Sequence, residues 1–167
     1  VIDEVLTEGV TSRLYSTLVR DKRLAASVLS DTNYPGVRAP NLFVIAATPL
    51  APHTTPEVES AIYEELDRLK AEPISTKEFE RVLNGLDADL VRSLRSNSGL
   101  ASQLAFYQTV AGTWRYVLNA RDRIAAVTPA DVQRVAAQYL TKPNRTVGVL
   151  VKKAQDKKMA AAGEVAR

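Results

Sequence analysis

Three arginines lie close together near the start of the chain, in the stretch SRLYSTLVRDKRLAAS at residues 12–27. Arg13, Arg20 and Arg23 stand beside an expected turn and strand, an arrangement that active sites also use. The stretch has no histidine or cysteine, so it offers no obvious base, nucleophile or set of metal ligands. Three interpretations stay open at this point: an active site, the remains of one, or ordinary surface.

A metal site is not predicted in this chain. His53 is the only histidine, and it precedes Glu57 by four residues with Pro56 between them. Zinc needs three or four converging ligands, which one His and one Glu placed across a loop and a helix start do not provide. The chain has no cysteine, so disulfides and thiolate ligands are excluded. We expect His53 to lie on a loop surface, and no cofactor to bind to this chain.

The remaining polar clusters have plain structural explanations. No G-x-S-x-G turn and no glycine-rich phosphate-binding pattern occurs, so serine hydrolysis and nucleotide binding are not predicted. Asp87 and Asp89 are two positions apart on an expected helix and point to different faces, which does not suit paired carboxylate catalysis. Arg92 and Arg95, with Asn97, either bind an anion or complement a helix dipole, and the dipole is the favoured explanation.

Length and composition suit one globular domain, or one lobe of a larger protein. The chain has 167 residues, 46% of them apolar, and a net charge of +3. This small basic excess, gathered partly near the C-terminus, does not favour nucleic acid as a partner. No run of 18 apolar residues occurs, so no membrane span is expected. The sequence begins with Val1 inside an expected helix, and we expect it to be a piece of a longer protein.

Periodicity predicts two strands after two short helices. The first helix starts at Ile2 and stops by Gly9, and the second runs from a cap at Thr11 or Ser12 to Asp21. Residues 24–30 alternate as a strand does, and DTNYPG follows as a turn. The run NLFVIAATP is almost continuously apolar, which predicts a strand that is covered on both faces or lies at the centre of a sheet, paired antiparallel with the first.

The rest of the chain is predicted to be mainly helical. Thr55 is expected to cap one helix, Ser75 and Glu78 to form the capping box of the next, and Thr128 to cap the last. Two further helices are expected near residues 100–112 and 114–126, and RTVGVLVK is expected to form a closing strand. Two apolar stripes are expected to pack on the strand at residues 42–47: Val58, Ile62, Leu66, Leu69 and Phe79, Leu83, Leu86, Leu90.

This order of elements predicts an α+β fold, with helices packed on one face of a small antiparallel sheet. We assign residues 1–151 to the domain. Residues 152–167, charged and then alanine-rich, are expected to form a linker or a frayed tail.

Three stretches, in this order, resemble the C-terminal domain of the insulinase-like (pitrilysin) zinc metallopeptidases. LTEGVTSRLYSTLVRDKRLAASV resembles the family's LGGGxSSRLxxxLREKRGLAYSV. VESAIYEELDRLKAEPISTKEFERV and IAAVTPADVQRVAAQYLTKPNRTVGVL resemble its helix–loop segment and its ending. The resemblance covers about residues 2–151. It implies one lobe of a clamshell whose homologous N-terminal domain, or subunit, carries the zinc motif.

The same resemblance implies an arginine and a tyrosine that hydrogen-bond the substrate carbonyl and the developing oxyanion. Arg20 matches the arginine, but the tyrosine has no counterpart, because its position falls on Ser27 by counting or on Ala26 by aligning LAAS with LAYS. The segment RLAAS is also one residue shorter and lacks the family's glycine, which predicts a changed turn. Arg20 is therefore interpreted as a vestigial site residue, with Arg23 as a weaker candidate for substrate binding.

The first hypothesis is a non-catalytic lobe that binds substrate peptide or pairs with a catalytic lobe, and that does not hydrolyse peptides alone. A second is an active lobe in which Arg20 acts with a displaced tyrosine, Tyr15 or Tyr34. A third is a protein-interaction module with no proteolytic function. The resemblance also favours a periplasmic or secreted location.

Overall fold

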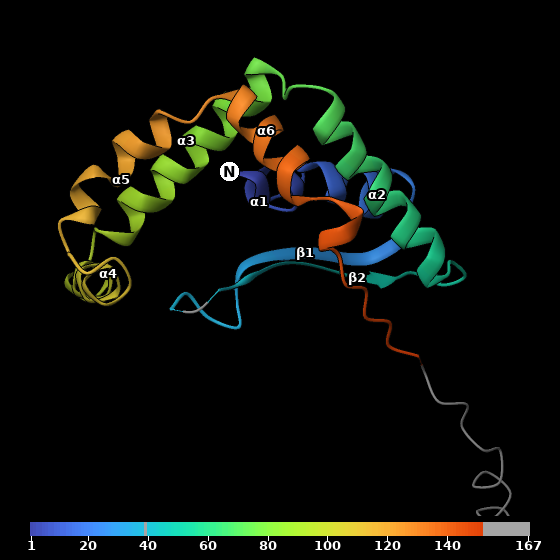
Figure 1. Ribbon diagram of the computed structural model, residues 1–167, viewed down its shortest axis with the longest axis horizontal. Coiled ribbons are helices and arrows are strands. Elements are labelled where there is room, and N and C mark those ends of the chain that lie inside the picture. The colour runs from blue at the N-terminus through green and yellow to red at the C-terminus, as the bar shows by residue number, and fades with distance from the viewer. Residues whose placement is uncertain (39, 152–167) are drawn as a thin grey trace, which may run out of the picture.

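The computed structural model describes residues 1–38 and 40–151. Along this part of the chain a short helical segment precedes a two-stranded hairpin, and the remaining elements are helices (Figure 1). In chain order the elements are α1 (Ile2–Leu6), the π-helix η1 (Tyr15–Asp21), β1 (Ala25–Tyr34), β2 (Leu42–Pro49), α2 (Thr55–Ala71), α3 (Thr76–Ser93), α4 (Asn97–Val110), α5 (Tyr116–Ala125), α6 (Pro129–Tyr139) and the 3-10 helix η2 (Lys142–Asn144).

The two strands pair antiparallel, as predicted, and Val28 lies opposite Ala47. The register shifts twice, between Ala25 and Ser27 and between Asp31 and Tyr34, and both times β1 holds one residue more than its partner. β1 therefore carries two bulges, whereas β2 is regular.

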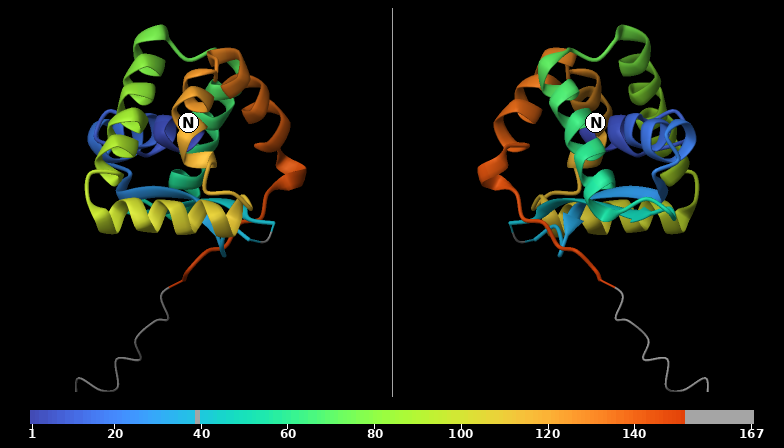
Figure 2. Two further views of the ribbon diagram at one scale, coloured as in Figure 1. Left: turned by 90° about the vertical axis from the view of Figure 1, so that its left-hand side faces the viewer. Right: turned by 90° about the vertical axis from the view of Figure 1, so that its right-hand side faces the viewer.

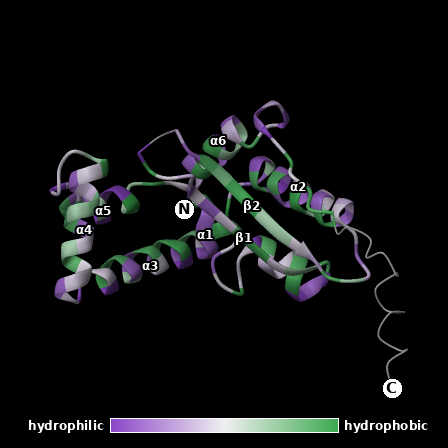
Figure 3. Cartoon of the chain, turned by 90° about the horizontal axis from the view of Figure 1, so that it is seen from below, coloured by the Kyte–Doolittle hydropathy of each residue, from purple (hydrophilic) through white to green (hydrophobic). Residues whose placement is uncertain are grey.

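Helices cover one face of this sheet, which confirms the predicted α+β fold. Figures 1 and 2 show α1, α2, α6 and η1 on the same side of the strands. Figure 3, seen from below, shows the opposite face without a covering helix. Leu29 and Leu42 are 55% and 60% exposed. The predictions that β2 is covered on both faces or lies at the centre of a sheet are both wrong for the described residues. The helices that pack on the strands lie on one side (Figure 1), and among those residues β2 pairs only with β1.

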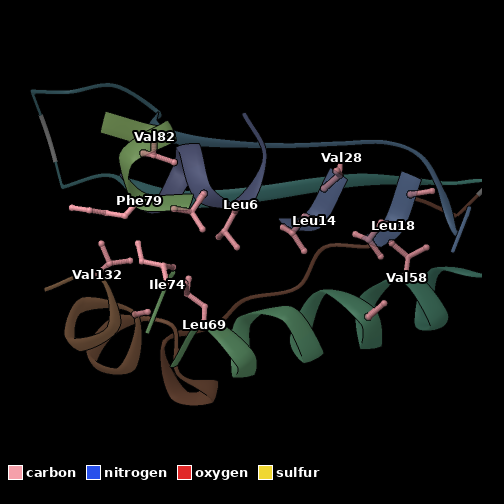
Figure 4. Close-up of a cluster of buried hydrophobic side chains, with 14 residues drawn as sticks. Leu6, Leu14, Leu18, Val28, Val58, Leu69, Ile74, Phe79, Val82 and Val132 are labelled. Atoms are coloured by element: carbon pink, nitrogen blue, oxygen red, sulfur yellow. The ribbon is translucent and has the colours of Figure 1, made fainter. Parts of the chain in front are cut away.

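The core lies between the sheet and the helices above it (Figure 4). α2 contributes Val58, Ala61 and Leu69, and Ile62 and Leu66 of the predicted stripe are only partly buried. The other core residues come from α1, the η1 region, β1, the α2–α3 loop, α3 and α6: Val5, Leu6, Leu14, Leu18, Ala25, Val28, Ile74, Phe79, Val82, Val132 and Ala136.

Helices α3, α4 and α5 form an arm that extends to one side of the sheet (Figure 1). α3 packs against α1, α4 and α5, so its stripe does not lie mainly on β2 as predicted. Only Phe79 and Val82 of α3 are buried, and Leu83 and Leu86 are partly buried. α4 has no buried residue.

The predicted helix caps are largely observed. Thr54, one residue before the predicted Thr55, forms a capping box with Glu57. The Thr128 hydroxyl accepts a hydrogen bond from the Asp131 N–H at 3.2 Å. The Ser75 hydroxyl accepts one from the Glu78 N–H at 3.2 Å, but the Glu78 carboxylate binds elsewhere, so only half of that predicted box forms.

Two predictions about the strands differ from the structure. β1 continues through residues 31–34, which were predicted as a turn, because they still pair with β2, and the chain turns at residues 35–38. The closing strand predicted at residues 145–152 is not formed at residues 145–151, where no neighbouring strand pairs with the chain. The predicted tail at residues 152–167 lies outside the described residues. Among the described helices, none is long and apolar enough to cross a membrane.

Candidate functional site

The arginine-rich stretch is fixed by its apolar residues. Leu14 and Leu18, four positions apart, are fully buried, and Tyr15 is partly buried against the same core. Ser12 is also fully buried, and its hydroxyl donates to the Gly9 carbonyl at 2.7 Å. The intervening chain winds into η1, a wide helix of a kind that often occurs at functional sites.

Charged and polar side chains bind this stretch to the two long helices. Arg13 donates two hydrogen bonds to the Glu78 carboxylate of α3, at 2.9 and 2.8 Å. The Thr17 hydroxyl donates to Glu65 of α2 at 2.9 Å. Glu65 is only 2% exposed, and Arg68 lies 3.1 Å from its carboxylate. Of the three arginines at the start of the chain, Arg13 is thus a structural residue.

Arg20 points away from the core and is paired with its sequence neighbour. Its guanidinium donates to the two Asp21 carboxylate oxygens at 2.6 and 3.0 Å, and both side chains are more than half exposed. Hydrogen bonding to Asp21 raises the pKa of Arg20, and the same contact lowers the pKa of Asp21. Two of the five guanidinium N–H donors of Arg20 are therefore bound to a carboxylate.

Arg23 occupies the changed turn that leads into β1. Its φ is +50°, in the left-handed region that glycine adopts without strain. It is the only non-glycine residue with positive φ in the described part of the chain. The Leu24 N–H, next in the chain, donates to the Leu18 carbonyl at 2.8 Å and closes the turn.

No phenol accompanies Arg20. Ala26 is the extra residue in the first bulge of β1, and both Ala26 and Ser27 are exposed. Tyr15 packs partly against the core, and Tyr34 lies at the far end of β1, 58% exposed. Among the described residues, neither tyrosine hydroxyl shares a hydrogen bond with Arg20, so the structure does not bring the predicted candidates together.

Comparison with known protein families identifies the family of this chain. The family described as "Peptidase M16 inactive domain" matches residues 1–86, which include η1, both strands, α2 and most of α3. The chain belongs to this family. The predicted membership of a zinc metallopeptidase family is thereby confirmed, and the match is to the inactive domain rather than to a zinc-binding one.

A curated relative is consistent with this family membership. A Streptomyces coelicolor protein called an uncharacterized zinc protease is 31% identical over 141 residues, which make up 84% of the chain but 30% of that protein. The chain therefore spans less than a third of its curated relative's length.

Two solved structures from Bordetella, each 26% identical with a TM-score of 0.77, are also similar. One is a protein from Bordetella pertussis Tohama I assigned as a zinc protease, with coverage of 91% of this chain and 82% of that one. The other, from Bordetella parapertussis, is described as the inactive peptidase domain of such a protein, with coverage of 89% and 79%. A Helicobacter pylori protease, 24% identical, shares the fold with a TM-score of 0.78, over 86% of this chain and 34% of that one.

The other candidates in this inactive domain are ordinary surface groups. His53 precedes α2, and its Nδ1 lies 3.7 Å from the Glu57 carboxylate. Nowhere in residues 1–38 and 40–151 do three or more His, Cys, Asp or Glu side chains gather as metal ligands would. Asp87 accepts from Arg121 at 2.9 Å, and Asp89 pairs with Arg92.

Sequence reasoning missed Glu65, a buried charged residue of α2. It lies four positions after Ala61 and four before Leu69, so it falls on the buried face of α2. A carboxylate in the middle of an apolar stripe was the available signal. It indicates a buried polar contact, although the sequence alone does not show that Thr17 supplies it.

Proposed function

We propose that this chain is a non-catalytic lobe of a zinc protease, which pairs with a homologous zinc-bearing domain and contacts peptide without taking part in hydrolysis. One observation carries the proposal. The Arg20 guanidinium is bound to Asp21, and Ala26 and Ser27 stand exposed where the family resemblance places a tyrosine.

The chemical argument concerns the oxyanion of peptide hydrolysis. A catalytic lobe must hold hydrogen-bond donors about 2.7–3.1 Å from the oxygen that becomes negative in the transition state. Arg20 already gives two of its five donors to Asp21, which neutralises its charge and directs that side of the guanidinium away from a substrate. The start of β1 offers an alanine methyl and a short serine hydroxyl instead of a phenol, so the arginine–tyrosine pair that the family resemblance implies is absent here.

Zinc belongs elsewhere in this proposal. The described residues do not fit a zinc site, because the only histidine is bound beside Glu57 and no third ligand accompanies them. The inactive-domain match and the zinc-protease relatives support a metal held by another domain. That domain is the proposed partner, and this lobe would cover the peptide from the opposite side.

The test is peptide hydrolysis by the parent protein with Arg20→Ala, Tyr15→Phe and Tyr34→Phe introduced one at a time. We expect turnover to change less than about threefold in each variant, because none of these side chains would stabilise the transition state. Circular dichroism checks folding. Lys22→Ala, a change at an exposed neighbouring cation, is the matched control for surface charge.

A fall in turnover of about 10²-fold for Arg20→Ala and for one tyrosine variant, with folding unchanged, would show a rebuilt oxyanion site and an active lobe. Pairing is tested separately by mixing this chain with the zinc-bearing part of the parent. Co-elution of the two is expected. Separate elution of two folded proteins would contradict lobe pairing.

A further inference from the structure

Four cations lie in the stretch at residues 12–27, and only one of them is not paired with a carboxylate of the described chain. The three paired cations and their partners are Arg13 with Glu78, Arg20 with Asp21, and Lys22 with Glu64. The fourth cation, Arg23, is exposed, and its side chain forms no ion pair or cation–π contact with any described residue. The stretch therefore presents one positive charge that the described carboxylates do not neutralise.

The backbone at Arg23 is strained. Its φ of +50° lies in the left-handed region, which costs a residue with a side chain more than it costs glycine. Outliers of this kind persist where the surrounding structure enforces them, and they cluster at active sites and ligand contacts. A long cationic side chain at a strained position, with no contact to the described fold, points to a role in binding.

The turn that carries Arg23 is held on both sides. The Leu24 N–H donates to the Leu18 carbonyl at 2.8 Å. Within η1, the Thr17 hydroxyl donates to the buried Glu65 carboxylate of α2 at 2.9 Å. The backbone that carries the guanidinium is thus fixed before a ligand arrives, which lowers the entropic cost of binding.

The residues after the turn leave room beside Arg23. Ala26 is the extra residue in the first bulge of β1, Ser27 follows it, and both are exposed. Bulges of this kind are frequent next to active sites, where they redirect the side chains of a strand. Ala26 and Ser27 are three and four positions after Arg23, at most about 14 Å along the chain. Their short side chains leave the start of β1 open to a peptide that also reaches the guanidinium.

We propose that Arg23 makes this lobe prefer peptides with an acidic side chain, Asp or Glu, at the position that faces the start of β1. The inference rests on the proposed function, in which the lobe contacts peptide. A guanidinium forms two parallel, charge-assisted hydrogen bonds with a carboxylate, as Arg13 does with Glu78. A neutral amide side chain lacks that charge. Arg23 is therefore a specificity residue and not a catalytic one.

The test measures peptide binding to the parent protein. The probes are fluorescein-labelled ten-residue peptides with one neutral sequence of alanine, leucine and serine. Each position in turn is replaced by glutamate and, in a matched set, by glutamine. A chelator prevents cleavage, and fluorescence anisotropy gives Kd. We expect glutamate to bind about five- to tenfold more tightly than glutamine at one or two adjacent positions, and high salt to weaken this preference.

Three variants assign the preference to Arg23. Arg23→Gln removes the charge, so the glutamate preference is expected to fall below about twofold while the glutamine peptides bind as before. Arg23→Glu is expected to favour lysine over glutamate at the same peptide position, a reversal that a merely structural role would not produce. Lys22→Gln is the matched control, because Lys22 lies in the same turn but already has Glu64 as its partner. Circular dichroism checks the folding of each variant.

Two results would overturn the role of Arg23 and leave the proposed lobe function intact. One is peptide binding with no preference for glutamate at any position. The other is a preference that persists in Arg23→Gln, as expected if Arg23 only complements the C-terminal end of η1, where a helix dipole favours a cation. Failure of the parent to bind any peptide of the panel would instead overturn both proposals.

Discussion

Arg13 and Glu78 are 65 positions apart in sequence and are joined by two parallel hydrogen bonds, at 2.9 and 2.8 Å. The pair fastens the turn before η1 to the start of α3. Both side chains are mostly buried, 16% and 19% exposed, and hydrogen bonding to Glu78 raises the pKa of Arg13. Such a fork-to-carboxylate contact fixes orientation as well as distance.

The first prediction follows from this pair. Glu78→Ala is expected to lower the free energy of unfolding by about 1.5–3 kcal/mol, because it leaves a mostly buried guanidinium without its acceptor. Urea unfolding of single and double variants in a cycle with Arg13→Ala measures the coupling. Arg92→Ala, from an exposed pair with Asp89, is the control and should change stability by less than about 0.5 kcal/mol. Equal effects would contradict a special role for Arg13.

The second prediction concerns the strained turn. Arg23→Gly is expected to raise the free energy of unfolding by about 0.5–1 kcal/mol, because φ at this position is +50° and glycine adopts it without strain. Lys22→Gly is the matched control: Lys22 has φ −83°, so the added flexibility should destabilise. Thermal melts of both variants test the difference in sign.

The third prediction separates the centre of the core from its margin. Leu69→Ala is expected to cost about 2–5 kcal/mol, because Leu69 is fully buried in the main cluster. Leu86 on α3 is only partly buried, so Leu86→Ala should cost clearly less. A larger loss of unfolding free energy in Leu86→Ala than in Leu69→Ala would mean that packing in the arm contributes more to stability than packing against the sheet.

The fourth prediction is a pH dependence from the two capping boxes. Hydrogen bonds from the Thr54 N–H and hydroxyl lower the pKa of Glu57 below its ordinary 4.5, and the Thr128 hydroxyl does the same for Asp131, together with Arg134. A lowered folded-state pKa gives stability that is present above the ordinary pKa and lost as pH falls through the folded value.

Melting temperature should therefore fall as pH drops below about 4.5, and Glu57→Gln/Asp131→Asn should lessen that fall. Melts near pH 6 and pH 3 check it. Glu64→Gln, which removes one exposed partner of Lys22, serves as the control for losing a carboxylate outside the capping boxes. An undiminished fall in the double variant would assign the acid sensitivity to other carboxylates.

Local signals predicted most of the secondary structure, and long-range contacts account for the rest. Thr128, Pro129 and Asp131 mark the start of α6 without any tertiary information. Glu78, however, has the spacing of a capping box and binds Arg13 instead, a choice that depends on a residue 65 positions away. The valines of residues 145–151 favour a strand, but a strand forms only where another strand offers its edge.

At the candidate site, too, residue types could be read from the sequence but long-range contacts could not. The missing phenol and the altered turn were visible in RLAAS, because residue types alone reveal them. That Arg20 pairs with Asp21 and that Ala26 sits in a bulge depend on backbone geometry that the letters do not specify. Glu65 was hidden for the same reason, since its partner Thr17 comes from a distant segment.

The arm, formed by α3, α4 and α5, also determines what the tryptophan fluorescence of this molecule reports. The only tryptophan, Trp114, joins α4 to α5, is 40% exposed, and has the Arg115 guanidinium 4.7 Å from its ring centre. Emission excited at the red edge of the absorption band therefore reports on the arm and not on the sheet. Because α4 buries no residue, that emission should change at lower denaturant concentration than the far-ultraviolet circular dichroism of the whole chain. A fluorescence transition at lower denaturant concentration would then report local unfolding of the arm and not unfolding of the whole chain.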